Sequence, residues 1–344
     1  MNQSLLANSN NNASGPEPVG AMISVLYPEY FFVPVLFVFG VVGNVITIRV
    51  MASPAYRNMP VSKLLMALSL SDILVNVLVL FNQPFSRGQF GLDVLASSSA
   101  GCVVFFWAYR FSRLTSSWMV VMISCERFVA VWLHTKAKAI NNTTNAYIAI
   151  GLVYGIFAVY AGYLGWCADR IVNGTCFMNI FNPETVHLAR AFLATSLITY
   201  NVLPSAMLVV INALIVYKLV KMNKARNRIT VGSSSSGQQL PGATSSRNRK
   251  TTVMLLSVTL AFVILVSPNA VTHLVSFVKR ENVFSATDRA TVLLREISQL
   301  CEQLDHSINF LLYVLSSKTF REDVLVLLKC GRVPSSVPRS TTND

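Results

Sequence analysis

Long apolar stretches that hold no charged residue alternate along the chain with short polar and basic segments. A charge at the centre of a bilayer is costly, so an uncharged stretch of roughly 20 residues predicts a membrane-spanning helix. Four such stretches lie at residues 30–48, 139–168, 191–217 and 251–278, and a fifth at 64–86 is interrupted only by Asp72. The pattern therefore predicts five transmembrane helices at these places.

Two further segments, 97–133 and 290–317, carry four charged residues each. Their apolar residues nevertheless recur at helical spacing, as at Phe105, Phe106 and Tyr109 in the first segment. In the second segment the series is Ile308, Leu311, Leu312 and Leu315. The charged groups on such helices are expected to face the interior of a bundle. We therefore predict an all-α integral membrane fold with seven transmembrane helices over residues 29–317.

Composition and charge agree with this fold and indicate its orientation. Only 12% of the residues are charged and 53% are hydrophobic, whereas a soluble domain carries about 25% charged residues, so a soluble enzyme is excluded. Of the 28 lysines and arginines, 19 fall on one side of the predicted membrane and 7 on the other. The positive-inside rule places the N-terminus outside, and the net charge of +13 indicates topology rather than binding to nucleic acid.

The segments outside the bundle are polar. Residues 1–28 form an asparagine-rich outer segment that we expect to be disordered, and they lack the apolar core of a signal peptide, so the first span is expected to act as an uncleaved anchor. A third cytoplasmic loop is expected at about 219–250, with a flexible Ser/Gly-rich centre at 232–246. The cytoplasmic tail covers residues 318–344.

Sites for covalent modification follow from this topology. Asn-x-Ser/Thr triplets predict glycosylation on the outer side at Asn2, Asn12 and Asn173. Two more triplets, at Asn141 and Asn142, lie on the inner side, where they are expected to be silent.

Short motifs occur in a fixed order along the predicted helices. They are Gly43-Asn44-Val45, Leu68 with Asp72, Cys102 placed 25 residues before the Arg127 of Glu126-Arg127-Phe128, the prolines Pro204 and Pro268, and Asn309-Phe310-Leu311-Leu312-Tyr313. In this order and spacing the chain resembles the rhodopsin-like (class A) G-protein-coupled receptors over residues 28–330. The string at 307–313 is particularly similar to invertebrate neuropeptide receptors of the FMRFamide-receptor type. The resemblance also implies a short amphipathic helix at the start of the tail.

Four positions depart from the family pattern. Phe128 replaces the tyrosine that follows the charge pair, and Phe310 stands at the proline of the last motif. Val266 and Asn212 replace aromatic residues of spans six and five. These departures concern the activation pathway and leave the fold prediction unchanged.

The resemblance implies a disulfide bond and a sodium site. Cys102 is expected to pair with Cys176 of the second outer loop, with Cys167 as the rival partner. The sodium site would be formed in mid-bundle by Asp72, Ser116, Asp305 and Asn309. Two alternatives stay open for these side chains: they hydrogen-bond only to one another across the helices, or a proton replaces the ion because Asp305 adds a second acid. In the tail, Cys330 is expected either to carry a palmitoyl chain or to be a plain thiol.

The resemblance places seven side chains toward a ligand pocket in the outer third of the bundle: Gln83, Tyr109, Arg110, Arg113, Gln299, Glu302 and Gln303. Tyr109 stands where receptors for biogenic amines carry an aspartate, and Gln303 stands where opsins carry the retinal-binding lysine. An amine and retinal are therefore disfavoured. Mixed charges among aromatic neighbours favour a peptide.

At the inner end the resemblance implies that Glu126, Arg127 and Tyr313 take part in coupling to a G protein. The expected function is a receptor of the plasma membrane that binds an extracellular neuropeptide and promotes GDP release from a heterotrimeric G protein. Its partners are then the peptide, the G protein and membrane lipid, and it needs no cofactor and performs no covalent chemistry. A chemosensory receptor for a small molecule is the alternative, and a transporter or channel is disfavoured because the chain has no internal repeat.

Overall fold

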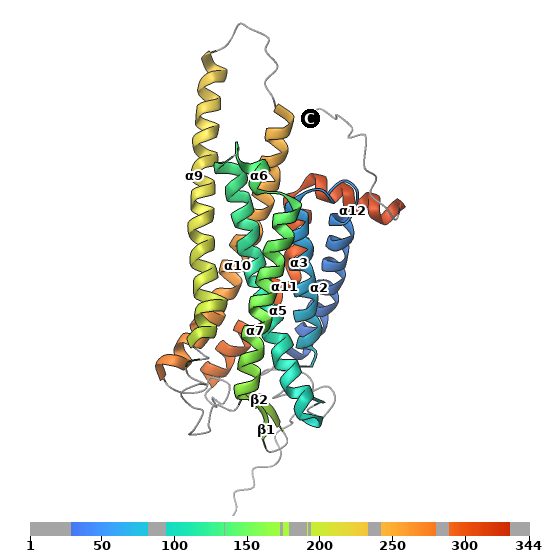
Figure 1. Cartoon of the computed structure of the whole chain (residues 1–344), viewed down its shortest axis with the longest axis vertical. Helices are drawn as coiled ribbons and strands as arrows, with labels where there is room; N and C mark the ends of the chain where they lie inside the picture. Colours follow the sequence, from blue (N-terminus) through green and yellow to red (C-terminus); the bar gives the residue numbers. More distant parts are fainter. Residues whose placement is uncertain are drawn as a thin grey trace, which may run out of the picture.

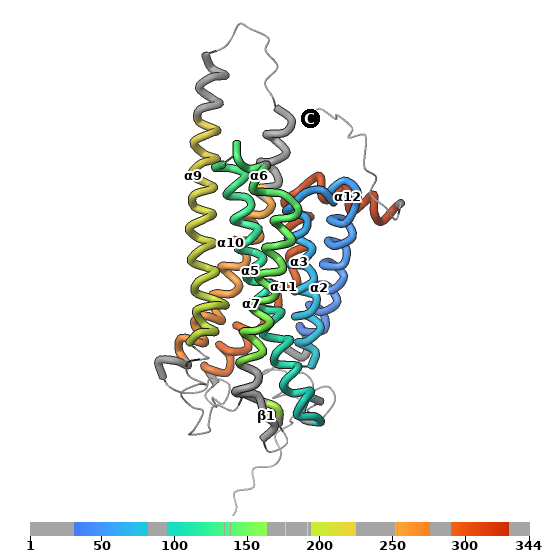
Figure 2. The backbone as a smooth tube through the Cα atoms, in the orientation of Figure 1, coloured from blue at the N-terminus to red at the C-terminus, as the bar shows by residue number. Residues whose placement is uncertain are grey.

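The computed structural model describes most of the chain between residues 29 and 330 (Figure 2). The described ranges are 29–81, 94–133, 135–172, 175–178, 191, 194–232, 242–279 and 289–330. The predicted ligand contact Gln83 and the predicted glycosylation sites Asn2, Asn12 and Asn173 lie outside these ranges.

Within the described residues, seven long helical segments run side by side along the long axis of the molecule (Figure 1). They are α2 (Glu29–Met51), α3 (Pro60–Val79), α5 (Ser99–Trp132), α7 (Thr143–Ala168), α9 (Leu203–Gly232) with the preceding π-helical turn η2 (Leu197–Val202), α10 (Gly242–Lys279) and α11 (Arg289–Ser316). Two short helices, η1 (Val94–Ser97) and α6 (Ala137–Ile140), lie in the connections. The predicted seven-helix bundle is confirmed.

Six of the seven long segments contain a stretch that is long and apolar enough to cross a membrane, and among the described residues α11 is the exception. It carries the acids Glu296, Glu302 and Asp305, which are only 0%, 5% and 5% exposed. Burial of these acids confirms that the charged groups of this helix face the interior of the bundle. The face of α11 that carries these acids therefore packs against the neighbouring helices.

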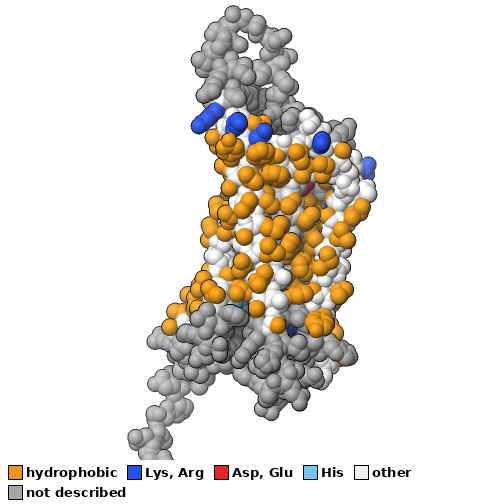
Figure 3. All heavy atoms as spheres, turned by 60° about the vertical axis from the view of Figure 1, so that its left-hand side comes forward, with side chains coloured by type: hydrophobic (Ala, Val, Ile, Leu, Met, Phe, Trp, Pro, Cys, Tyr) orange, Lys and Arg blue, Asp and Glu red, His pale blue; other side chains and the backbone are white. Residues whose placement is uncertain are grey.

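The outer surface of the bundle is apolar. Figure 3 shows hydrophobic side chains over the middle of the visible face, with Lys and Arg gathered toward the upper end. Val159, Phe31 and Ile156 are 75%, 66% and 62% exposed. A water-soluble monomer rarely exposes so large an apolar area, so this surface is suited to the hydrocarbon core of a bilayer.

Two glycines allow α2 to approach its neighbours closely. A Cβ atom on Gly43 would lie 2.8 Å from the Cβ of Phe310 in α11. A Cβ on Gly40 would lie 2.8 Å from the Asn76 amide nitrogen and 2.8 Å from the Ser307 hydroxyl. Small residues at such crossings allow the helix backbones to pack tightly in a membrane. The glycine of the sequence motif, Gly43, therefore has a packing role.

We expect Gly43→Ala to destabilise the receptor by about 1 to 3 kcal/mol, because the added methyl group would overlap the Cβ atom of Phe310. The matched control is Gly151→Ala in α7, where an added Cβ meets no atom within 4 Å. That change should be neutral or stabilise by up to about 1 kcal/mol, since alanine favours the helix. Thermal unfolding of the detergent-solubilised protein measures both effects, and equal midpoints would contradict the packing role.

The ends of three helices differ from the sequence-based boundaries. Helix α3 ends at Val79, and the chain turns at Leu80 and Phe81, ahead of the sequence boundary at residue 86. Helix α9 continues to Gly232, and α10 begins at Gly242, so both helices extend into the predicted loop. Lysine, arginine and alanine are common in these extensions, and such residues favour helix even where the chain leaves the membrane.

The tail begins with α12 (Lys318–Cys330), which lies across the upper end of the bundle in Figure 1. Phe320 and Val324 are buried, whereas Leu325 and Leu328 are exposed. Asp323 accepts a hydrogen bond from the hydroxyl of Tyr56, which ties α12 to the turn between α2 and α3. The amphipathic helix predicted at this place is confirmed. The side chain of Cys330 is not among those described, so its lipidation stays a prediction.

Candidate functional site

A disulfide bond attaches the loop before η2 to the start of α5. The loop contains an antiparallel pair of strands, β1 (Asp169–Val172) and β2 (Thr175–Met178), in which Ile171 lies opposite Cys176. Cys176 is bonded to Cys102 in the first turn of α5. The pairing that the family resemblance implied is therefore present, whereas the strand pair was not predicted from the sequence.

Breaking this bond should lower the amount of folded receptor. We expect Cys176→Ala to cost about 2 to 5 kcal/mol, because the bond closes a loop with a sequence separation of 74 residues. Cys301→Ala is the control, since Cys301 is a free thiol. Cell-surface labelling and non-reducing peptide mass mapping provide the measurements. A bond between Cys102 and Cys167, or unchanged surface expression of Cys176→Ala, would contradict the assignment.

A buried ion pair joins α5 to α11, and on α5 it lies closer to Cys102 than to Arg127. Arg113 forms a salt bridge with Glu302, and their side chains are 18% and 7% exposed. The Tyr200 hydroxyl, from η2, donates to the same carboxylate at 2.5 Å, and Asn269 of α10 donates to its other oxygen at 2.9 Å. Four helical segments therefore meet at one carboxylate. A buried charge requires such partners, since an unpaired one would be strongly destabilising.

Aromatic rings enclose the arginine of this pair. The guanidinium carbon of Arg113 lies 4.4 Å from the ring centroid of Tyr200 and 5.2 Å from that of Tyr109. A cation held near the faces of aromatic rings gains electrostatic stabilisation. The five residues Tyr109, Arg113, Tyr200, Asn269 and Glu302 are called the outer polar cluster below.

The structure brings only part of the predicted ligand set into this cluster. Tyr109, Arg113 and Glu302 belong to it, whereas Arg110 lies with its guanidinium carbon 5.2 Å from the Phe106 ring centroid. Gln299 and Gln303 lie on α11 within one turn of Glu302. Sequence reasoning missed Tyr200 and Asn269. Asn269 follows Pro268 directly in a largely apolar span, and a polar residue in such a place was a signal that could have found it.

A second buried cluster surrounds Asp72 in the middle of the bundle. One carboxylate oxygen of Asp72 accepts from the Ser116 hydroxyl at 2.5 Å, and the other accepts from the Asn309 amide at 2.8 Å. Nδ1 of His306 lies 2.9 Å from the first oxygen. Asp305 is buried but is not a hydrogen-bond partner of Asp72. We call Asp72, Ser116, His306 and Asn309 the central cluster.

His306 is the member of the central cluster that sequence reasoning missed. Three of the four predicted sodium ligands, Asp72, Ser116 and Asn309, are in direct contact, and the imidazole lies against two of them. The backbone carbonyl of His306 also accepts from Asn44 at 3.0 Å and from Asn76 at 3.3 Å. Helices α2, α3 and α11 are therefore joined at this residue. The sodium site stays a prediction, and the imidazole is an observation against it.

The inner end of α5 carries a neighbouring ion pair. Arg127 donates to both carboxylate oxygens of Glu126, and the side chains are 11% and 9% exposed. Asn141 of the following connection donates to the Glu126 backbone carbonyl at 2.9 Å and to its carboxylate at 3.3 Å. The sequence had marked Asn141 only as a silent glycosylation triplet. In the structure it holds Glu126 in place for Arg127.

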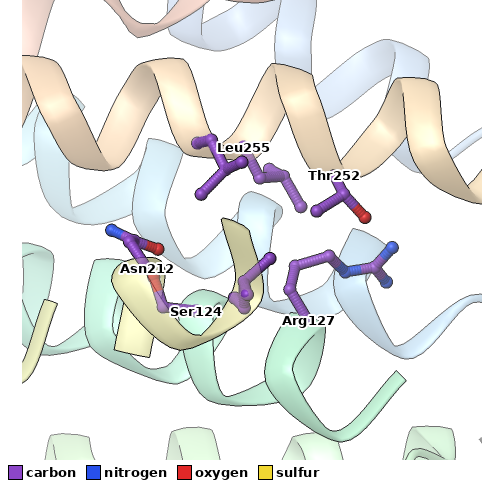
Figure 4. A pocket seen from close by; sticks show the side chains of 7 residues that line it. Ser124, Arg127, Asn212, Thr252 and Leu255 are labelled. Carbon is purple, nitrogen blue, oxygen red and sulfur yellow. The ribbon is translucent and has the colours of Figure 1, made fainter. Parts of the chain in front are cut away.

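A narrow cleft lies beside Arg127 between α5, α9 and α10 (Figure 4). It is too narrow to hold a water molecule, and it is lined by Ser124, Arg127, Asn212, Ile215, Thr252, Leu255 and Leu256. In Figure 4 the Arg127 guanidinium points away from Asn212. Asn212 instead donates to the Thr259 hydroxyl at 2.7 Å and links α9 to α10. So small a space cannot take a partner helix, which is about 10 Å wide, without movement of these helices.

Tyr313 does not line this cleft. It is fully buried, and its ring packs edge to face on Phe320 of α12 at 5.6 Å between centroids. Its predicted part in coupling would therefore require a change in the packing between α11 and α12.

Comparison with known proteins agrees with this arrangement. Residues 43–304 match the family described as 7 transmembrane receptor (rhodopsin family). The chain is 25% identical to the galanin-like G-protein coupled receptor npr-9 of Caenorhabditis elegans, over 89% of this chain and 74% of that one. It is 24% identical to galanin receptor type 2 of Rattus norvegicus (87% and 74%) and 22% identical to the allatostatin-A receptor of Bombyx mori (87% and 80%). Because the family match covers well over half of its length, the chain belongs to the rhodopsin family of seven-transmembrane receptors.

Proposed function

We propose that this receptor binds an extracellular peptide and promotes GDP release from a heterotrimeric G protein. As a member of the family with apolar helices, it is a multi-pass protein of the plasma membrane and not an enzyme. Galanin and allatostatin-A name the ligands of similar receptors, and this likeness supports a peptide ligand.

The observation that carries the proposal is the outer polar cluster. Glu302 is already paired with Arg113 and hydrogen-bonded to Tyr200, so it offers no unpaired carboxylate to a small amine. A peptide brings backbone carbonyls and amides that can replace several of these bonds at once. Separating Arg113 from Glu302 would leave a buried charge without its partner, which costs free energy. A ligand that forms hydrogen bonds with the separated groups would lower this cost and so favour a different arrangement of the four helical segments.

Signal transfer would follow the length of α5. Arg113 and Arg127 are 14 residues apart, which is about 21 Å at 1.5 Å per residue. A peptide that favours a wider arrangement of α9 and α10 would open the cleft beside Arg127 by shifting a pre-existing equilibrium. Pro268 lies inside α10 directly before Asn269, a member of the outer polar cluster, and this proline would connect ligand contacts to movement of α10.

The proposed orientation puts the disulfide outside and the basic end inside. The Cys102–Cys176 bond requires an oxidising compartment, which the extracellular side provides. Lys and Arg gather at the end that carries α12 (Figures 1 and 3). The N-terminus, before α2, then lies outside, where Asn2 and Asn12 are available for glycosylation.

A screen on membranes tests the function directly. Candidate peptides, including galanin and allatostatin-A peptides, and a matched set of biogenic amines and metabolites are added to receptor and purified G protein, and nucleotide exchange is measured. A peptide should raise exchange on the unmodified receptor but not on Arg127→Ala. Activation by a small molecule alone would favour the chemosensory alternative and contradict the peptide proposal.

A further inference from the structure

We propose that the imidazole of His306 fills, from within the chain, the place beside Asp72 where the family resemblance predicts a sodium ion, and that this receptor therefore does not bind sodium there. The proposal concerns the central cluster and is independent of the ligand. It rests on the hydrogen bonds of Asp72, on the ligand preference of sodium, and on the way α11 is held against α2 and α3.

The Asp72 carboxylate already has three polar side chains within hydrogen-bond distance. Its first oxygen contacts Ser116 Oγ at 2.5 Å and His306 Nδ1 at 2.9 Å, and its second oxygen accepts from Asn309 at 2.8 Å. Asp72 and His306 are both fully buried. The protein therefore satisfies this buried acid with its own side chains, as a buried acid requires.

The imidazole also lies directly against two of the predicted ligands. Ser116 Oγ lies 3.3 Å from His306 Nδ1 as well as 2.5 Å from Asp72. A hard cation such as sodium takes oxygen ligands, whereas an imidazole nitrogen suits softer transition metals. The ring therefore covers the hydrogen-bonded pair of Ser116 and Asp72 on this side without becoming a sodium ligand itself. Sodium could bind here only by displacing the ring.

Contacts to the backbone hold His306 at this depth. Asn44 of α2 and Asn76 of α3 both donate to its carbonyl, at 3.0 and 3.3 Å. The next residue, Ser307, donates to the Asn76 side-chain oxygen at 2.9 Å. Two helices, α2 and α3, thus fix the height and rotation of α11 at the residue whose ring reaches Asp72. Asp305, the remaining predicted ligand, supplies none of the hydrogen bonds to Asp72.

The experiment measures thermal unfolding of the purified receptor in sodium chloride and in choline chloride at equal ionic strength, with potassium chloride as a third condition. An ion that binds only the folded state raises the unfolding midpoint once the ion concentration exceeds the dissociation constant. We expect the midpoint of the unmodified receptor to differ by less than about 1 °C between the salts. This readout requires neither the peptide nor a G protein.

Removing the ring should create sodium sensitivity. His306→Ser leaves oxygen atoms and space beside Asp72, so sodium should raise its midpoint by about 2 °C or more relative to choline. Adding Asp72→Asn to this variant should abolish the difference. His273→Ser is the matched control, because it removes a histidine from α10 and leaves His306 in place. If His306→Ser does not fold, His306→Ala also opens the space and takes its place.

Two results would overturn the proposal. One is a sodium-dependent rise in the midpoint of the unmodified receptor that disappears in Asp72→Asn, because it would show that sodium binds despite the imidazole. The other is a folded His306→Ser or His306→Ala variant that responds to sodium no more than to choline, because it would show that the ring is not what excludes the ion.

Discussion

Replacing Arg127 with alanine is expected to reduce nucleotide exchange on the G protein to background, while Glu126→Gln is expected to raise basal exchange about tenfold. Arg127 makes two hydrogen bonds to the Glu126 carboxylate, and a neutral amide would retain only weaker ones. A loss of about 1.4 kcal/mol from the resting state corresponds to a tenfold shift in population. The double variant should be as inactive as Arg127→Ala, because the freed arginine is the group that would meet the G protein.

This experiment needs no identified ligand, since Glu126→Gln provides the activity that Arg127→Ala must remove. Arg57→Ala is the control for loss of a positive charge, because Arg57 is exposed in the turn between α2 and α3. Receptor amounts in each membrane preparation are matched by surface labelling. Substantial exchange by the double variant would show that Arg127 has a different role from the one the family resemblance implies.

The second large effect is expected at the outer polar cluster. Arg113→Met leaves the Glu302 carboxylate buried without its cation, and such a change costs about 3 to 5 kcal/mol. Adding Glu302→Gln to Arg113→Met removes the uncompensated charge and should recover part of that loss. The double variant is therefore expected to be more stable than Arg113→Met alone. Thermal unfolding of the unmodified receptor, Arg113→Met, Glu302→Gln and the double variant in one detergent gives the coupling energy between the two side chains.

Arg110→Met is the matched control for this cycle. Arg110 lies one turn before Arg113 on α5 and places its guanidinium near Phe106, so its loss is expected to cost about 1 kcal/mol or less. If the effects of Arg113→Met and Glu302→Gln add within about 0.5 kcal/mol, the two side chains are not energetically coupled. The ligand proposal built on this pair would then lose its main support.

The spans of this bundle illustrate two different kinds of sequence information. Uncharged stretches such as 251–278 reveal a span directly, because lipid excludes charge over the whole segment. Helices α5 and α11 had to be inferred from helical spacing because both carry charged residues, and the acids of α11 proved to be buried, as Glu296 shows. The helix ends were less predictable: α9 continues to Gly232 beyond the apolar stretch because helix propensity does not depend on lipid.

The candidate sites were only partly accessible from the sequence. The family resemblance assigned Cys102, Asp72 and Arg127 to their sites from their spacing in the sequence. It also named the partners that the structure shows for Cys102 and Arg127, which are Cys176 and Glu126. For Asp72 the sequence suggested Ser116 and Asn309 but not His306. A histidine inside a transmembrane helix is compatible with many neighbours, so its type alone does not reveal which acid it meets.

The sequence by itself determined the number of spans, the fold class and the side on which basic residues gather, because these depend on the local exclusion of charge from lipid. Only the tertiary structure decided which polar groups meet. Glu302 gains Tyr200 and Asn269, and Asp72 gains His306, through residues that are 33 to 234 positions apart in the chain. Such pairs depend on how each helix is rotated and how deeply it lies against its neighbours. Periodicity shows that a helix has an inward face, but packing against the other helices fixes what that face contacts.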